Sequence, residues 1–319
     1  VMKPLQMYGL KLLVNFELFA RRRGFQSFNK LLLNSGRRSC LNKQRTMSSN
    51  VLNTGAKEVL QHRLEQAEDC ATLLCAVVEN IHDPDVYDAY AKRNSEIFKP
   101  YMHEFIVINR AYTKDMAHFR LLWTSAPEEG GPCEQRVDRM PIVLSRGKGV
   151  LHWVLSEAYL AEGGNIGNRH AASSHSQVYI ANGPPTEVAS TVAAAIASGE
   201  VGFLLIELWP REHAIYEKIA AALASHGGAR IVLAESKAEG EPLEKKSRTP
   251  RGGWTAELQV LEGHCPSASA IEIWQFPSWK HAEDCATSEA FTAAIHSELE
   301  ETKARGRIMA FSPKLKSQM

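Results

Sequence analysis

The sequence predicts a mixed α+β fold built from two tandem βαββαβ units, behind a basic N-terminal segment that belongs to neither unit. The chain has 319 residues, which suits two domains of ordinary size. The same order of expected strands and helices occurs in both halves. A Ser-Glu-Ala-aromatic motif recurs at corresponding places, at 156–159 and at 288–291. Shared order, spacing and motif together indicate an internal duplication.

The composition is that of a globular chain, with 44% hydrophobic and 23% charged residues and a net charge of +1. No apolar run reaches the roughly 18 residues that a membrane span needs. The six cysteines show no metal-ligand or disulfide spacing. A net charge this close to zero indicates no particular partner. The basic loop with Lys245, Lys246 and Arg251 lacks the wider basic face that nucleic-acid binding needs. We therefore expect a small organic ligand as partner, with no nucleic acid and no membrane.

The N-terminal segment differs from the rest, because residues 2–46 contain ten Lys and Arg but a single acid, Glu17. This composition is typical of a mitochondrial transit peptide. The alternative is a start at Met47, with the preceding residues a disordered or untranslated leader. The expected location is mitochondrial if residues 1–46 are translated, and cytoplasmic from Met47 otherwise. In either case residues 1–50 are excluded from the fold.

The first half begins with a helical lead-in over 51–71, and a domain is expected over 72–183. Short apolar runs rich in β-branched residues predict strands, and Pro84 and Pro100 fit the start and the end of one helix. The glycines and proline of 128–132 mark a long loop. The expected order is strand 72–80, helix 86–98, strand 104–110, strand 141–145, helix 150–161 and strand 177–182.

The second half repeats this order after an Ala-rich linker helix over 184–200, with a domain over 201–313 and a tail over 314–319. Gly227 and Gly228 end its first helix, and residues 236–253 are polar enough for a long loop. The expected order is strand 201–209, helix 211–226, strand 230–234, strand 270–276, helix 280–302 and strand 307–312.

Each unit predicts an antiparallel four-stranded sheet with both helices on one face. The other face must also be covered, because apolar side chains alternate along the first strands. We assign that face to Leu74, Ala76 and Val78 in the first unit and to Leu204, Ile206 and Leu208 in the second. Packing of one sheet on the other would give a pseudo-dimeric α/β barrel, as a monomer or as a homodimer.

The stretch from Val260 to Gly263, the strand Ile271–Phe276 with Pro277 and Ser278, and the segment 288–291 resemble the family known as domain of unknown function 1330. Residues 83–90 and 156–180 of the first half resemble the same pattern. The resemblance implies ferredoxin-like units of the dimeric α/β-barrel superfamily, with a ligand cavity between sheet and helices. That superfamily contains cofactor-free monooxygenases, isomerases, haem enzymes and proteins without known activity.

Candidate site residues concentrate in the first half. A base and an anion clamp need histidines, carboxylates and arginines near an aromatic pocket. The expected catalytic residues are His152, His170 and Glu79. The expected substrate-binding residues are Asn109, Arg110, Arg169, Trp153 and Tyr90. The alternative is that the histidines are exposed at helix ends and that the aromatic residues only fill the core.

Two functions remain open. The first is a cofactor-independent oxygenase- or isomerase-like enzyme that acts on a small, largely apolar molecule, with molecular oxygen as a candidate co-substrate. The second is a non-catalytic ligand-binding or stress-related protein whose two units complete a barrel. No cofactor or metal is expected, since no dinucleotide, P-loop or zinc-protease motif is present.

Overall fold

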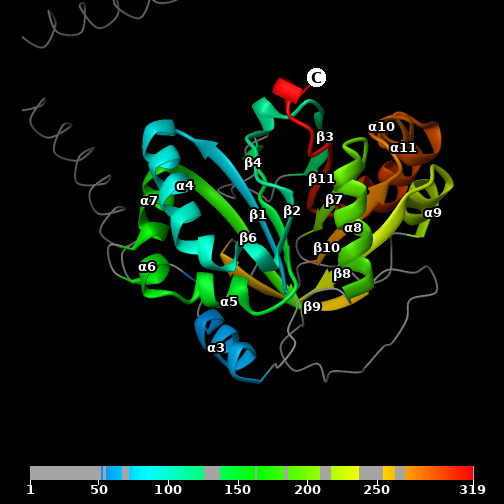
Figure 1. Cartoon of the computed structure of the whole chain (residues 1–319). Helices are drawn as coiled ribbons and strands as arrows, with labels where there is room; N and C mark the ends of the chain where they lie inside the picture. The colour runs from blue at the N-terminus through cyan, green and yellow to red at the C-terminus, as the bar shows by residue number, and fades with distance from the viewer. Residues whose placement is uncertain are drawn as a thin grey trace, which may run out of the picture. The chain divides into compact units, whose positions relative to one another are not determined.

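The computed structural model describes residues 52, 55–66, 72–125, 137–161, 164–182, 186–208, 217–236, 254–262 and 270–318. The leader predicted over 1–50 and most of the loop predicted over 236–253 lie outside the described residues. From Val51 onward the chain is mixed α+β, and its described strands form one curled eleven-stranded sheet with helices on the outer faces (Figure 1). No described helix is long and apolar enough to cross a membrane.

The first half follows the predicted order and adds three elements. Its elements are α3 (Ala56–Gln66), β1 (Thr72–Ile81), α4 (Pro84–Phe98), β2 (Phe105–Asn109), β3 (Phe119–Ser125), β4 (Val137–Arg139), β5 (Ile142–Ser145), α5 (Gly149–Val154), α6 (Glu157–Leu160), α7 (Asn165–Ala172) and β6 (Ser173–Asn182). Helix α4 begins where the side chain of Asp83 accepts a hydrogen bond from the Val86 amide at 3.1 Å, with Pro84 in the first turn. The additions are α7, β3 and β4, and the single helix predicted over 150–161 is two short helices.

The second half also keeps the predicted order and adds one strand. Its elements are α8 (Thr186–Ser198), β7 (Gly202–Leu208), α9 (Glu217–Ser225), β8 (Ala229–Glu235), β9 (Trp254–Glu262), β10 (Ala270–Phe276), α10 (Trp279–Ala286), α11 (Glu289–Ile295) and β11 (Gly306–Phe311). Ser278 and Ser288 cap α10 and α11 by accepting hydrogen bonds from the amides of His281 and Phe291. The strand that was not predicted is β9, and the single helix predicted over 280–302 is two short helices followed by a π-helical turn at His296–Glu300.

The strand order is the same in the two halves. The whole sheet runs β2-β5-β1-β6-β9-β8-β10-β7-β11-β3, so that second, third, first and fourth strands follow one another in each half. Two further strands cross between the halves. Strand β9 of the second half pairs with β6, the fourth strand of the first half. Strand β3 of the first half pairs with β11, the fourth strand of the second half.

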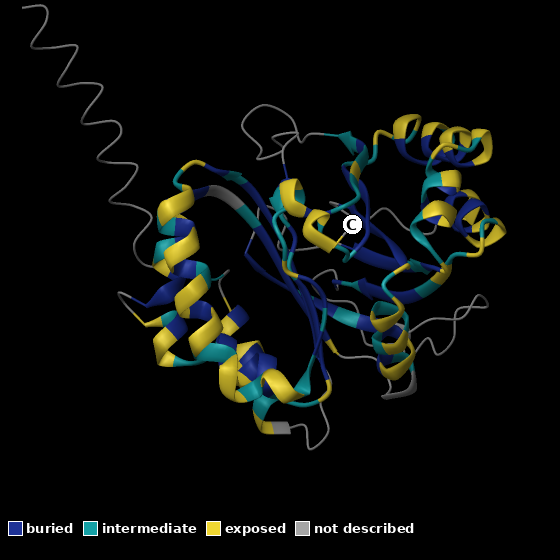
Figure 2. Ribbon diagram, turned by 45° about the horizontal axis from the view of Figure 1, so that its top comes forward, coloured by how far each residue is buried: buried dark blue, intermediate teal, exposed yellow. Residues whose placement is uncertain are grey.

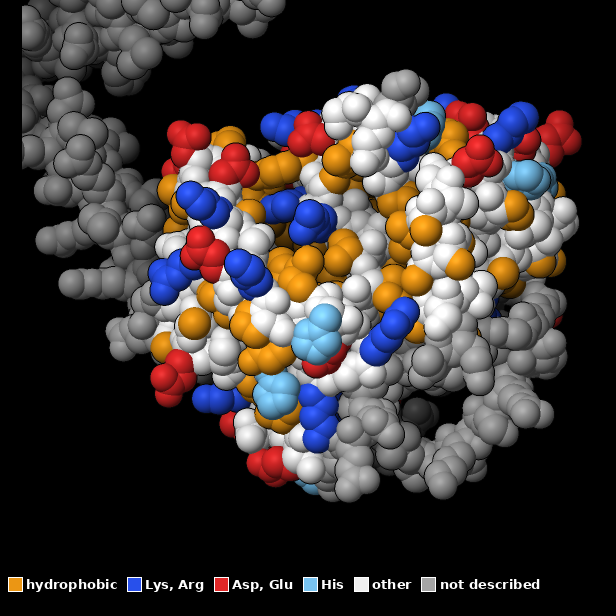
Figure 3. Space-filling view, in the orientation of Figure 1, with side chains coloured by type: hydrophobic (Ala, Val, Ile, Leu, Met, Phe, Trp, Pro, Cys, Tyr) orange, Lys and Arg blue, Asp and Glu red, His pale blue; other side chains and the backbone are white. Residues whose placement is uncertain are grey.

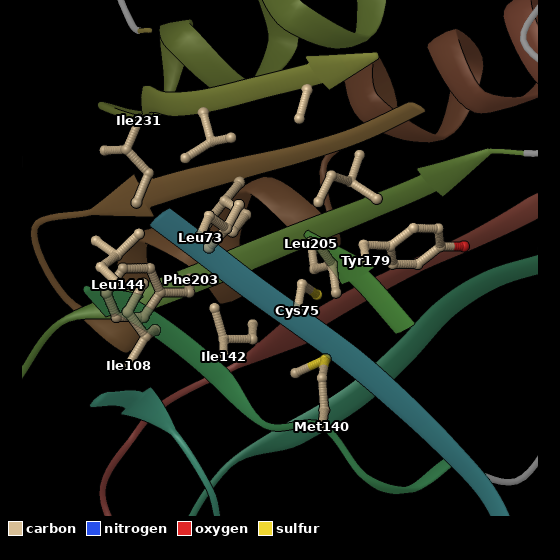
Figure 4. Packing of buried hydrophobic residues seen from close by; sticks show 14 of the residues in the cluster. Leu73, Cys75, Ile108, Met140, Ile142, Leu144, Tyr179, Phe203, Leu205 and Ile231 are labelled. Atoms are coloured by element: carbon tan, nitrogen blue, oxygen red, sulfur yellow. The ribbon is translucent and has the colours of Figure 1, made fainter. Parts of the chain in front are cut away.

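The curl of the sheet brings the inner faces of the two halves together around one buried core (Figure 4). Leu73, Cys75 and Val77 of β1 meet Phe203 and Leu205 of β7 there. The faces assigned from the sequence were therefore reversed. Successive strand residues point to opposite faces, and both sets along β1 and β7 are apolar. The alternation of side chains along β1 and β7 therefore separates the residues of the two faces, but it does not show which face meets the other sheet.

The outer face of each half carries the apolar residues that the sequence had assigned to the inner face, and it is covered by helices (Figure 2). Leu74, Ala76 and Val78 pack with residues of α3 to α7. Leu204, Ile206 and Leu208 pack with residues of α9, α10 and α11. The linker helix α8 instead packs on the central core through Ala189 and Val192. Each half therefore has its own layer between sheet and helices, separate from the shared central core.

Candidate functional site

A cavity of about 90 Å³ lies between the sheet of the first half and the helices that cover it. Apolar side chains of the outer sheet face form one wall: Leu74, Ala76, Val78, Val143 and Val178. Aromatic side chains of α4, α5 and α6 form the other: Tyr87, Tyr90, Phe98, Trp153 and Tyr159. An apolar cavity with a few polar groups is the usual form of a small-molecule site.

Trp153 is held in place at the centre of the aromatic wall. Its ring makes edge contacts with Phe98 and Tyr159, at centroid distances of 5.4 and 5.6 Å. Its indole N–H donates to Asn94 Oδ1 at 2.9 Å, and Asn94 Nδ2 donates to the Tyr90 hydroxyl at 3.4 Å. Because the indole N–H is satisfied, Trp153 offers a fixed apolar surface to the cavity.

A buried ion pair lies at the inner side of the cavity. Arg169 of α7 donates to one carboxylate oxygen of Glu262, and His170 Nε2 lies 2.9 Å from the other. The Arg169 and Glu262 side chains are only 3% and 8% exposed, whereas that of His170 is 34% exposed. Glu262 ends β9, so the second half supplies one charged residue of the first half's cavity.

The charges of this pair are stabilised by each other. Burial alone would raise the pKa of Glu262, but the positive charge of Arg169 and the hydrogen bond to His170 outweigh it, and the pKa is lowered. Burial alone would lower the pKa of Arg169, but Glu262 and nearby tyrosines keep it well above its ordinary value. Both groups are therefore charged near neutral pH.

Three tyrosines of the cavity are neutral phenols. Burial raises the pKa of Tyr87, Tyr90 and Tyr159 above the ordinary value of a tyrosine. Tyr87 and Tyr90 make an edge contact at a centroid distance of 5.2 Å. The phenols can donate hydrogen bonds to a ligand but supply no phenolate base.

Two arginines stand at the opening of the cavity, where they line it and also reach solvent. Arg110 follows β2 and is exposed, and Arg139 ends β4 and is half-buried. Arg139 Nε donates to the carbonyl of Arg110 at 3.0 Å. Figure 3 shows a hollow with hydrophobic side chains on this side of the molecule and Lys and Arg side chains beside it.

The structure brings five of the eight predicted site residues together. Tyr90, Trp153, Arg110 and Arg169 all line the cavity. His170 lies behind the lining, in contact with Glu262.

His152 and Asn109 lie outside the cavity lining, which corrects their predicted placement. His152 is exposed, because its neighbours Leu151 and Trp153 occupy the buried side of α5. Its ring stacks on that of Tyr101, with the ring centroids 5.8 Å apart. Asn109 is buried, but its Nδ2 donates to the Met140 carbonyl at 2.6 Å. The pairing of β2 with β5 shifts register between Val107 and Asn109, which changes the direction of that side chain.

Glu79 is also misplaced by the prediction, since it faces the core between the two sheets. It lies on the same face of β1 as Leu73, Cys75 and Val77, opposite the cavity. Arg307 of β11 places Nη1 2.6 Å from Glu79 and Nε 2.5 Å from Glu207. This cluster joins the two halves and is separate from the ligand cavity.

Sequence reasoning missed Glu262, Asn94 and Arg139 as site residues. Asn94 sits one helical turn after Tyr90 on the same face of α4, which is a detectable signal. Arg139 lay in a stretch interpreted as loop. Glu262 reaches the cavity only because β9 crosses to the first half, and no local pattern reveals such a pairing.

Comparisons with known proteins give weak likenesses. No family model and no curated protein matches the chain, so the resemblance to domain of unknown function 1330 is not confirmed. A candidate monooxygenase from Lactobacillus acidophilus NCFM is 11% identical, with a TM-score of 0.30 over 78% of this chain and 98% of that chain. Chlorite dismutase from Candidatus Nitrospira defluvii is 12% identical, with a TM-score of 0.33 over 79% of this chain and 95% of that chain. An anthrone oxidase-like protein is 10% identical, with a TM-score of 0.33 over 78% of this chain and 95% of that chain.

These neighbours have the dimeric α/β-barrel fold. One expectation is contradicted. The chlorite dismutase neighbours are haem-binding proteins, which contradicts the expectation that no cofactor is involved.

Haem does not fit the cavity as the structure describes it. Haem iron is held by His, Cys, Met or Tyr, and the residues that line the cavity include no His, Cys or Met. Burial keeps its tyrosines protonated, which disfavours a phenolate ligand. Across the described residues, no group of three His, Cys, Asp or Glu side chains is arranged to hold a metal ion.

Proposed function

We propose that the first half binds a small, largely apolar organic molecule in the cavity between its sheet and its helices. The observation that carries this proposal is a buried aromatic wall that faces apolar strands across about 90 Å³ of space. That volume is of the same order as the ~150 Å³ cavity that accepts benzene in another protein. The fixed Trp153 ring supplies a flat surface for the ligand.

Filling the cavity tests this proposal. Val143 lies on the sheet wall, and Val143→Trp is expected to weaken binding of indole at least tenfold in calorimetric titration. Val59→Trp on α3 is the matched control, because Val59 is 37% exposed and lies outside the cavity lining. The control is expected to bind indole as the native protein does. Equal affinity in the native protein and Val143→Trp would show that the cavity is not the site.

A second candidate function is turnover of that ligand in an oxygenase- or isomerase-like reaction that starts with removal of a proton from carbon. Glu262 lines the cavity and contacts His170, whose side chain reaches solvent. A proton taken up by Glu262 can therefore pass to His170 and leave. The lowered pKa of Glu262 limits its strength as a base, so we rank turnover below binding.

Deuterium exchange separates the two candidate functions. The α-protons of phenylacetone exchange in D₂O, and proton abstraction in the cavity would accelerate that exchange above the buffer rate, as followed by NMR. Glu262→Gln is expected to lower the protein-dependent rate at least tenfold, whereas Glu157→Gln, an exposed carboxylate on α6, leaves it unchanged. Exchange at the buffer rate with the native protein would leave binding as the function.

The proposed architecture is a tandem pair of ferredoxin-like units that forms a pseudo-dimeric barrel, as expected from the resemblance to domain of unknown function 1330. The shared strand order of the two halves supports this. So does the reciprocal pairing of β9 with β6 and of β3 with β11. Two equal units related by a pseudo-twofold axis would produce this exchange. Expression of residues 201–319 alone is expected to give an unfolded or self-associated chain, since its inner sheet face would be exposed.

A further inference from the structure

The opening of the cavity carries positive charge that the protein does not neutralise by ion pairing. Among the described residues, neither Arg110 nor Arg139 forms an ion pair with a carboxylate. Asp88 on α4 carries a carboxylate in this region, but it accepts the hydrogen bond of the Tyr112 hydroxyl at 2.5 Å. Two guanidinium groups therefore reach the cavity opening without an anion of the described residues bound to them.

Arg139 is held in one orientation before any ligand arrives. Its guanidinium carbon lies 4.7 Å from the centroid of the Tyr112 ring and 5.4 Å from that of Tyr87. Its Nε donates to the carbonyl of Arg110 at 3.0 Å. A guanidinium group has five N–H donors. The side chain of Arg139 also makes a hydrogen bond with Tyr87, and its remaining donors are available to an anion. A fixed arginine loses little side-chain entropy when it binds an anion.

The charge at the inner side of the cavity is different. Arg169 is paired with Glu262, and the carboxylate also contacts His170. A second anion placed there would meet the negative charge of Glu262 and would lose its hydration without a free cation in return. An anionic group is therefore favoured at the opening and disfavoured at the inner side.

We propose that the ligand is an aromatic anion, a carboxylate or phenolate on a flat ring, with its charged group at Arg110 and Arg139 and its ring against Trp153. This inference rests on the proposed function and specifies the ligand class of the same cavity. A carboxylate can accept parallel hydrogen bonds from one guanidinium group. The ring then enters the apolar space between the sheet wall and the aromatic wall.

A matched pair of probes tests the charge requirement with the native protein. Benzoate and benzamide have the same ring and nearly the same shape, but only benzoate is charged. In calorimetric titration at low salt, benzoate is expected to bind at least tenfold more tightly than benzamide, and 0.5 M NaCl is expected to reduce that preference. Equal affinities would overturn the inference and leave the proposed function standing. Binding of neither probe, nor of indole, would overturn both.

Two substitutions locate the charge. Arg110→Gln and Arg139→Gln are each expected to weaken benzoate binding about tenfold and to leave benzamide affinity within about twofold. Arg146→Gln is the matched control, because Arg146 is exposed and lies outside the lining. If Arg139→Gln perturbs the fold through its contacts with the tyrosines, Arg110→Gln still decides the question, since Arg110 is exposed. Equal weakening of both probes in Arg110→Gln would overturn the inference.

Discussion

The two halves share a strand order but use their helix-covered faces differently. In the first half, Val143 of β5 lies opposite Leu74, and the space above them is a cavity. In the second half, Trp274 of β10 lies opposite Leu204, and its indole is buried in the core with Phe291 and Phe276. The strand position that holds Val143 in the first half therefore holds the much larger Trp274 in the second.

The strands that cross between the halves increase this difference. Strand β9 brings Glu262 to the inner side of the first half's cavity. Strand β3 brings Trp123 into the helix-covered core of the second half. The first half therefore receives a polar group beside a cavity, and the second receives an aromatic side chain that fills its core. One architecture therefore encloses a cavity in one half and a filled core in the other.

The largest expected effect comes from truncating a side chain in the filled core of the second half. Trp274→Ala is expected to lower the free energy of unfolding by about 3–5 kcal/mol, because it leaves a large void in a packed core. Val143→Ala is expected to cost about 1 kcal/mol or less, because Val143 already borders empty space. Urea unfolding followed by circular dichroism measures both. Similar losses would mean that the two halves are equally well packed.

Removal of the buried arginines is expected to have the next largest effect. Arg169→Met leaves the buried Glu262 carboxylate without its ion-pair partner and is expected to lower the free energy of unfolding by about 3 kcal/mol. Arg230→Met in the second half is expected to cost less, roughly 1–2 kcal/mol, because Arg230 lies 3.7 Å from Glu272 and makes a weaker pair. The same urea experiment applies. A double variant, Arg169→Met with Glu262→Leu, should recover part of the loss, and no recovery would contradict this account.

The smallest effect is an opposite dependence of stability on pH. The pKa of Glu262 is lowered, so its contribution is present above the unfolded pKa of about 4.3 and is lost as pH falls through the folded pKa. The pKa of Glu272 is raised, because burial outweighs the nearby Arg230 and the hydrogen bond from Trp274. Its contribution is present below about 4.3 and is lost as pH rises through the folded pKa.

Unfolding between pH 3 and 7 distinguishes the two carboxylates. As pH falls, the advantage of the native protein over Glu262→Gln should shrink, whereas its stability relative to Glu272→Gln should improve. Glu157→Gln, an exposed control, should follow the native curve. Slopes of the same sign for the first two variants would contradict the opposite pKa shifts.

Local sequence patterns predicted most of the regular structure. The strand over 270–276 has the predicted bounds, and the strand predicted over 72–80 extends by one residue. The proline at 84 and the glycines at 227 and 228 placed helix ends correctly. Each of these signals depends on residues close together in the chain. Strands β3 and β9 were missed, because they are stabilised by pairing with distant strands rather than by a strong pattern of their own.

The candidate site was predicted only in part, because local patterns do not show which distant segments come together. Tyr90, Trp153 and Arg169 follow one another around the helices of the first half, so their convergence on one cavity could be expected from the order of elements. Glu79 could not be placed, because a strand with apolar residues on both faces does not show which face a polar residue shares with a ligand. Glu262 could not be found, because its partner Arg169 lies 93 residues earlier in the chain.

The amino-acid sequence by itself determined the order of strands and helices, the repetition of that order, and the concentration of aromatic and basic residues in the first half. Only the tertiary structure decided which sheet face became the shared core, which strands crossed between the halves, and which half kept an open cavity. Local periodicity specifies an element and its two faces. Packing of long-range partners, and the volume of side chains such as Val143 and Trp274, decides what each face meets.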